Sequence, residues 1–185
     1  MKVYLNPGHD VEYDSGACNP DKNLREADVA LRIGERVKKY LESAGCEVRM
    51  LQSDNLCGWD CRRSDRPVAV TEDANEWNAD VFVSIHCNAY NTEASGCEVE
   101  CYGAGLGETL ATCIYDQIVD NIPLKRRGVR HMPALMVLKY TDMPACLVET
   151  AFIDNDGDAD LLIEREDEFA RAIARGVTDY QCEVE

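Results

Sequence analysis

Short apolar runs alternate along the 185-residue chain with longer segments of helical periodicity. Residues 80–85 (DVFVSI) are apolar and partly β-branched, which predicts a strand covered on both faces of a parallel sheet. In residues 24–43 apolar side chains recur at helical spacing, and Gly45 follows as a stop signal. The same criteria predict strands at residues 2–6, 47–51, 97–102, 134–139 and 145–150, and helices at residues 68–77, 106–119, 158–162 and 166–180. We therefore predict one α/β domain over residues 1–185, a mostly parallel twisted sheet flanked by helices on both faces.

Residues 7–23 form a second kind of segment, rich in Gly, Asp, Asn and Pro. They predict a loop long enough to indicate a function, and residues 52–65 predict another polar loop. Composition adds little, because 45% hydrophobic and 29% charged residues are ordinary for a soluble globular domain. No apolar run approaches membrane-spanning length, so we expect no membrane insertion. The net charge of −16 argues against a nucleic-acid partner, because phosphate contacts need a basic surface.

Ten cysteines are spread along the chain, and no CxxC pair occurs among them. A zinc ribbon is therefore not expected. Without an export signal, most cysteines are predicted to be reduced thiols that act as small core residues. If a disulfide forms, the Cys57/Cys61 loop is the expected place.

Two of the three histidines follow predicted strands. His9 lies just beyond residues 2–6, and His86 comes directly after residues 80–85. Ligands of open α/β sheets bind outside the carboxyl ends of the strands, so both histidines are candidates for one site. Glu149 closes an apolar strand, where a carboxylate is costly unless it is paired, bound to metal or catalytic. His131 has no strand-end context and is interpreted as a non-ligand.

A catalytic zinc site fits this inventory, since it commonly takes two His and one Glu and leaves a position for water. A further carboxylate can then move the proton from the water to the leaving amine. Spacing alone does not decide which glutamate is the ligand: Glu12, Glu26, Glu98 and Glu149 all remain open. Glu26, in the first turn of a helix, could also simply complement the helix dipole.

Four stretches, in order along the chain, resemble the signature stretches of the zinc-dependent N-acetylmuramoyl-L-alanine amidases of the amidase-3 family. They are residues 3–9 (VYLNPGH), 24–31 (LREADVAL), 84–89 (SIHCNA) and 147–155 (LVETAFIDN). Shorter similarities between and after them, such as Arg127-Gly128 and Met143-Pro144, extend the resemblance over nearly the whole chain.

The resemblance implies one zinc ion held by His9, Glu26 and His86, with Glu149 as the catalytic carboxylate. Asn88 matches the same motif as His86 and is predicted to orient a ligand or to bind substrate. Three features depart from the family pattern: Asn6 replaces the usual Asp, Asp10 replaces a Gly, and residues 70–73 lack the Arg that the family often has there. We expect Asn6 still to orient His9 by accepting a hydrogen bond.

The implied reaction is hydrolysis of the amide between N-acetylmuramic acid and the L-alanine of the stem peptide, so the expected partner is peptidoglycan or its muropeptides. Another zinc peptidase or deacetylase of the wall, or a non-catalytic wall-binding module of this fold, are the alternatives. A phage lysin, a bacterial autolysin and the catalytic part of a larger protein all fit the sequence. No signal peptide is visible, so we expect synthesis in the cytoplasm and action on the wall after release or by a non-classical route.

Overall fold

The computed structural model describes residues 1–58 and 68–185, which fold around one six-stranded sheet. The strand order is β4-β1-β5-β8-β6-β7. Every neighbouring pair is parallel except β6 and β8, so β6 and β7 run opposite to the other four strands. The strands are β1 (Lys2–Pro7), β4 (Glu47–Met50), β5 (Val81–Asn88), β6 (Cys97–Cys101), β7 (Arg126–His131) and β8 (Ala145–Phe152). The predicted mostly parallel α/β fold is confirmed.

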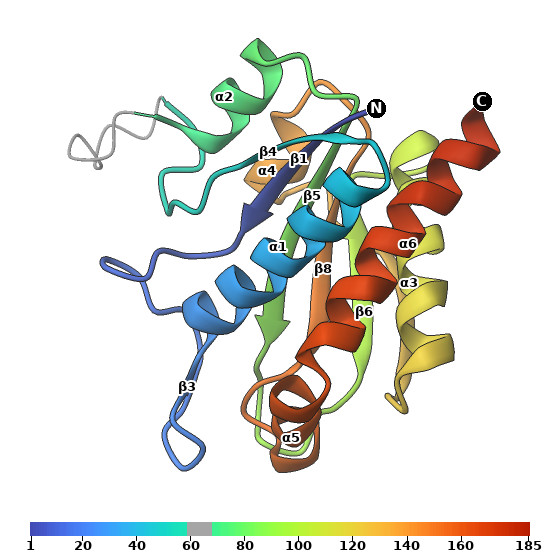
Figure 1. Cartoon of the computed structure of the whole chain (residues 1–185). Helices are drawn as coiled ribbons and strands as arrows, with labels where there is room; N and C mark the ends of the chain where they lie inside the picture. The colour runs from blue at the N-terminus through green and yellow to red at the C-terminus, as the bar shows by residue number, and fades with distance from the viewer. Residues whose placement is uncertain (59–67) are drawn as a thin grey trace.

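Helices cover the two faces of the sheet unequally. On one face α1 and α3 pack against the strands and α6 packs against both helices, as Figure 1 shows. The other face carries α2 and α4, whose apolar residues contact Tyr4, Phe82 and Leu147. The helices are α1 (Glu26–Ser43), α2 (Val70–Glu76), α3 (Leu106–Asn121), α4 (Met136–Lys139), α5 (Asp156–Glu164) and α6 (Glu166–Val184).

The contacts of α2 and α4 lie over the amino-terminal halves of β1, β5 and β8. In Figure 1 the arrows of β1 and β5 point away from these two helices. Side chains alternate between the faces of a strand, so Glu149 projects from the same face of β8 as the covered Leu147. The carboxyl half of this face therefore carries polar residues beyond the region that the two helices cover.

Two neighbouring segments differ from the prediction. Residues 134–139 were expected to form a strand, but Met136–Lys139 is the short helix α4. A brief apolar run does not distinguish a strand from a buried helical turn, and here Val137 and Leu138 pack into the smaller core. Arg126–His131 (RRGVRH) is a strand that its sequence does not predict. It lies at the edge of the sheet, where charged side chains are tolerated because one side is open to water.

The boundaries near the candidate site also shift. β5 continues past His86 to Asn88, so His86 lies inside a strand rather than after it. β8 continues two residues beyond the predicted 145–150, to Phe152. Their pairing is irregular between His86 and Asn88. The predicted loop 7–23 contains one strand of a small hairpin, β2 (Cys18–Asn19) paired with β3 (Leu24–Arg25), which leads directly into α1.

Cysteines in apolar segments of the described chain pack in the core, as predicted, whereas Cys18 and Cys182 are exposed. Several are buried core residues, and these eight are free: Cys18, Cys46, Cys87, Cys97, Cys101, Cys113, Cys146 and Cys182. The suggested Cys57/Cys61 pairing lies outside the described residues, because Cys61 falls in the gap. Among the described helices, none is long and apolar enough to cross a bilayer.

Gly176 lies where α6 packs directly against the backbone of α3. A Cβ added there would lie 2.4 Å from Ile114 Cα, which is backbone and cannot turn away. We expect Gly176→Ala to destabilise the fold by about 1–3 kcal/mol, because overpacking outweighs the better helix propensity of Ala. Urea denaturation measures this change. Gly157→Ala is the control, since its Cβ meets only Asn155 Oδ1 at 3.5 Å; equal losses in both variants would contradict the packing argument.

Candidate metal and catalytic site

Three separate elements bring His9, Glu26 and His86 together. β1 and β5 are paired up to Pro7 and Ile85, and the Gly8 amide donates to the Ile85 carbonyl at 2.8 Å, so His9 emerges beside His86. Glu26 is the first residue of α1. Its own amide donates to the Ala17 carbonyl at 2.8 Å, so the loop 7–23 holds the start of the helix at this edge of the sheet.

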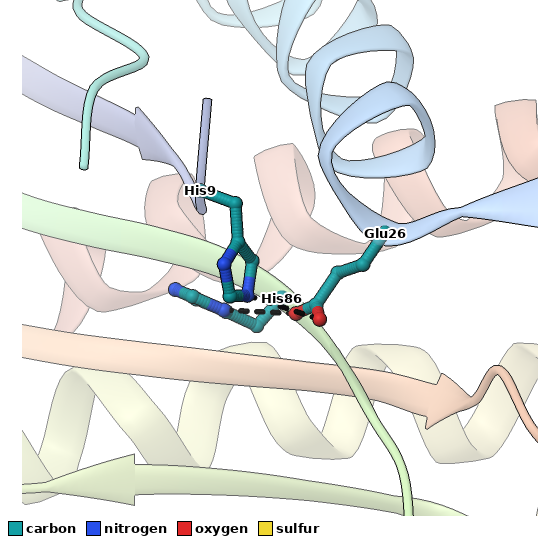
Figure 2. A group of neighbouring side chains, drawn as sticks. All are labelled: His9, Glu26 and His86. Carbon is teal, nitrogen blue, oxygen red and sulfur yellow. Dashed lines mark hydrogen bonds and ion pairs between the residues drawn. The ribbon is translucent and has the colours of Figure 1, made fainter. Parts of the chain in front are cut away.

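The two imidazoles converge on one carboxylate. Glu26 Oε2 lies 3.0 Å from His9 Nε2, and Glu26 Oε1 lies 2.9 Å from His86 Nδ1. The rings meet edge to face with their centroids 5.0 Å apart, and Figure 2 shows both directed toward Glu26. One potential ligand atom from each residue lies within 4.8 Å of the others. Within residues 1–58 and 68–185, no other group of three such side chains has this geometry.

The charges of the site are strongly coupled. Burial opposes ionisation of Glu26, yet hydrogen bonds from His86 and His9 outweigh it and lower the pKa of this carboxyl below its usual range. The amides of Ala17 and Cys87 also donate to it, at 2.9 and 3.0 Å. Burial likewise opposes protonation of His9, but Glu26 and Asp14 raise its pKa to about 9. A buried anion that holds two imidazoles is a natural place for a cation, and the donor set is that of a catalytic zinc site.

Asp14 orients His9. Its Oδ2 lies 2.9 Å from His9 Nδ1, which places the proton on Nδ1 and leaves Nε2 to face Glu26. The prediction that Asn6 plays this part is wrong. The Asn6 amide donates to the Leu51 carbonyl at 3.0 Å, and its Oδ1 accepts from the Ser84 hydroxyl. Asn6 points into the sheet because strand alternation puts it on a buried face next to β5.

Replacing Asp14 should therefore weaken metal binding without removing a ligand. We expect Asp14→Asn to lower zinc affinity by about 10–100-fold, because His9 loses the carboxylate that fixes its tautomer. Competition with a chromophoric chelator measures the change. Asp28→Asn removes another acidic side chain near the start of α1 that does not contact His9, and it should bind zinc like the parent. Equal affinity in all three proteins would refute the orienting role.

Two glycines allow the backbone to wrap this closely around the imidazoles. A Cβ on Gly8 would overlap the His86 ring, and one on Gly16 would meet Glu26 Oε2 at 2.6 Å. Gly16 also has a φ of 62°, a region that favours glycine. The loop 7–23 can close over the site only because these positions lack side chains.

Glu149 completes the polar edge. It lies opposite His86 in the register of β5 and β8. Its Oε2 atom is buried and has no hydrogen-bond partner in the described part of the chain. Burial raises the pKa of this carboxyl well above its usual range, and the negative charges of Glu26, Glu100 and Glu98 add to the effect. A buried, unpartnered carboxylate is costly and usually marks a function.

Asn88 and Glu98 lie next to this carboxylate. Glu98 is the register partner of Glu149 on β6, and Asn88 donates its side-chain amide to Glu98 Oε1 at 2.8 Å. Asn88 Oδ1 accepts from the Ala89 amide. Both ends of the Asn88 side chain are therefore engaged within the protein. A role in binding substrate stays a prediction.

A family comparison then decides the class of protein. The model of the N-acetylmuramoyl-L-alanine amidase family matches residues 3–179. The chain belongs to this family. It is 33% identical over 184 residues to the N-acetylmuramoyl-L-alanine amidase LytC of Bacillus subtilis, covering 96% of this chain and 35% of LytC. It is 32% identical over 190 residues to the endolysin of Bacillus phage SPP1, covering 98% of this chain and 65% of the endolysin.

Solved amidase structures have the same fold. The N-acetylmuramoyl-L-alanine amidase AmiC2 of Nostoc punctiforme superposes with a TM-score of 0.83 at 32% identity, covering 98% of this chain and 97% of AmiC2. An N-acetylmuramoyl-L-alanine amidase from Clostridium difficile 630 gives 0.82 at 28% identity, covering 100% and 98%. The chain therefore corresponds to nearly the full length of both solved amidase chains, and to about a third of LytC.

Among the other candidates for this amidase-family site, Glu12 is exposed in the loop and outside the metal-binding group. His131 is also outside this group, as predicted. The prediction assumed that His131 does not end a strand, and this assumption is wrong, because His131 is the last residue of β7. β7 runs opposite to β5, so its carboxyl end lies at the other edge of the sheet, where His131 Nε2 bonds to Glu108 at 2.8 Å. Asp14 was missed: only its place in the long polar loop, five residues after His9, could have indicated it.

Proposed function

We propose that this amidase-family chain is a zinc-dependent peptidoglycan hydrolase that cuts the amide between N-acetylmuramic acid and the L-alanine of the stem peptide. The observation that carries the proposal is the convergence of His9, Glu26 and His86 beside the buried, unpartnered Oε2 of Glu149. A binding module has no need of a metal-binding group and a free carboxylate together. One zinc per chain would be held by these three residues.

Zinc, when bound, polarises the scissile carbonyl and acidifies a water molecule. The protein's part is to keep the ligands ionised and oriented. The backbone amides of Ala17 and Cys87 donate to Glu26 and favour its anionic form. His9 presents Nε2 because Asp14 accepts from Nδ1.

Glu149 moves the proton. Its Oε2 has no competing hydrogen bond in the described residues, so it can take the proton of the attacking water and deliver it to the leaving amine. The raised pKa of its carboxyl suits this task, because a base that gives its proton back works best when its pKa lies near the operating pH.

The decisive test is a digest of purified muropeptides with the zinc-loaded protein, read by mass spectrometry. We expect free stem peptides with a new L-alanine amine, and no product after chelation of the metal. Cleavage of peptide–peptide bonds alone would make the protein a peptidase, and release of acetate would make it a deacetylase; either result overturns the proposal. Peptidoglycan lies outside the cytoplasmic membrane, so this activity requires release or export of the protein.

A further inference from the structure

Two arginines of the edge strand β7 converge on one buried carboxylate. Arg127 Nε lies 2.9 Å and Arg130 Nε 2.7 Å from the same oxygen, Glu98 Oε2. Glu98 is 6% exposed, whereas the side chain of Arg130 is 49% exposed. The carboxylate is inside the protein and the cationic groups reach outward from it.

This arrangement fixes the direction of both guanidinium groups. Arg127 Nε donates a hydrogen bond to Glu98 and Arg130 Nε forms an ion pair with the same oxygen. The Arg127 guanidinium also stacks over the Phe152 ring, 4.9 Å from its centroid. The polar contacts found for Arg127 and Arg130 in the described chain use Nε, so the terminal nitrogens are available to a ligand. Guanidinium N–H groups held in a plane match a carboxylate or phosphate ligand.

The arginine pair lies beside the proposed reaction centre. Asn88, two residues after His86, donates to Glu98 Oε1 at 2.8 Å, and Glu98 is the register partner of Glu149. Neighbouring strands are about 4.8 Å apart, so Glu98 is on the order of 10 Å from His86, two strands away. Glu98 and Arg127 lie near the amino-terminal ends of β6 and β7, which reach this edge because the two strands run opposite to β8. Arg130 lies further along β7, opposite Glu100, and its long side chain reaches back to Glu98.

Charge selects the kind of ligand. Two guanidinium groups against one carboxylate leave an excess of positive charge in a protein whose net charge is −16. Two further acidic groups lie nearby: Glu149, the register partner of Glu98, and Glu100, the register partner of Arg130. Burial raises the pKa of both carboxyls and so disfavours their charged forms. An anionic group of a substrate would meet directed donors here rather than general repulsion.

We propose that Arg127 and Arg130 bind a carboxylate of the stem peptide, and specifically the free α-carboxylate of the D-glutamate that follows L-alanine. The assignment rests on the proposed amidase activity. An extended chain covers about 3.3–3.6 Å per residue, so a group two residues beyond the cut bond lies roughly 7 Å from it, within reach of the arginines. Glu98 and Asn88 act as positioning residues, because Glu98 contacts both guanidinium groups at Nε and Asn88 holds the Glu98 carboxylate.

The test compares two substrates that differ only at this group: N-acetylmuramoyl-L-alanyl-D-glutamate and its α-amide, N-acetylmuramoyl-L-alanyl-D-isoglutamine. We expect the zinc-loaded protein to prefer the free acid in kcat/KM by about tenfold or more, since a charge-assisted hydrogen bond is lost with the amide. Arg127→Gln and Arg130→Gln should each lower kcat/KM for the acid, mainly through KM, and leave the amide nearly unchanged. Zinc content and Tm should stay at parental values in Arg130→Gln, whose side chain is largely exposed.

Arg126→Gln is the matched control. Arg126 is on the same strand but bonds Asp120 at 2.6 Å, and its loss should keep the preference for the acid. Equal kcat/KM for the two substrates in the parent, or an equal effect of Arg126→Gln, overturns the assignment while the amidase activity stands. If neither substrate is cut, the proposed function is at fault. Calorimetry with L-alanyl-D-glutamate and its α-amide then decides about the arginines, because equal affinities would overturn their role and tighter binding of the acid would support it.

Discussion

Replacing Glu149 with glutamine is expected to lower amide hydrolysis by about 10²–10⁴-fold while zinc remains bound, since the change removes a proton carrier and no ligand. Glutamine has the same shape as glutamate and cannot take the proton of the attacking water. The measurements are kcat on a muropeptide and the zinc content of the purified variant. Loss of zinc together with activity would show that Glu149 belongs to the ligand set.

The same substitution should stabilise the zinc-free protein at neutral pH. The folded state raises the pKa of Glu149 above its unfolded value, so the protonated form is favoured and the ionised form is penalised. The penalty disappears as the pH falls below the unfolded value of about 4.3 and is greatest above the folded pKa. The Tm of Glu149→Gln should therefore exceed that of the parent at pH 7, by about 2–4 °C for each kcal/mol gained, and match it in acid.

Glu100→Gln is the control for both measurements. Glu100 lies on the same face of the sheet, and burial also raises the pKa of its carboxyl. It is farther from the carboxyl edge, opposite Leu147, and should keep parental kcat. A similar loss of activity in both variants would point to the charge of the whole face rather than to a proton transfer by Glu149.

Glu26→Gln is expected to have the largest effect on metal binding. Glu26 accepts from the amides of Ala17 and Cys87 and from both imidazoles, so its carboxylate supplies the negative charge of the site. Glutamine has nearly the same volume as glutamate but carries no charge. Its side-chain NH2 group would also face one of the backbone amides or imidazoles that now donate to Glu26. Zinc affinity should fall by more than the roughly 10–100-fold typical of losing an outer partner, and hydrolysis should fall with it.

Glu12→Gln is the matched control for Glu26→Gln, because spacing in the sequence left both residues open as ligands. Glu12 is exposed in the loop 7–23 and lies outside the metal-binding group. Its variant should bind zinc and hydrolyse substrate like the parent. If Glu12→Gln lost zinc and Glu26→Gln kept it, the proposed ligand set would be wrong.

The sequence predicts the parts of the site that depend on strand ends. His9 and His86 are found by position, because parallel strands deliver their carboxyl ends to one edge. Glu26 is not found this way: it reaches the site through a backbone bond between the start of α1 and Ala17, a tertiary contact with no periodic signal. The family resemblance supplied it. Neither strand position nor the family resemblance predicts Asp14. The orienting role was assigned to Asn6 instead, whereas Asp14 is the residue that bonds His9 Nδ1.

The other failures have one physical cause. β7 carries almost no apolar pattern, because an edge strand can leave charged side chains in water. Hydrophobic periodicity therefore did not predict this strand, nor where its arginines lie. α4 was mistaken for a strand because four residues are too few to show a helical period.

Because β6 and β7 run opposite to the other strands, catalysis and the proposed recognition of the stem peptide depend on different parts of the sheet. The metal ligands and Glu149 depend on β1, β5, β8 and the start of α1, whereas the proposed carboxylate site depends on β6, β7 and the side chain of Asn88. Substitutions in the reversed pair can alter which stem peptides are accepted and leave zinc chemistry intact. Grafting β6 and β7 from a relative with a different wall chemistry would thus be a direct route to a hydrolase with altered target range.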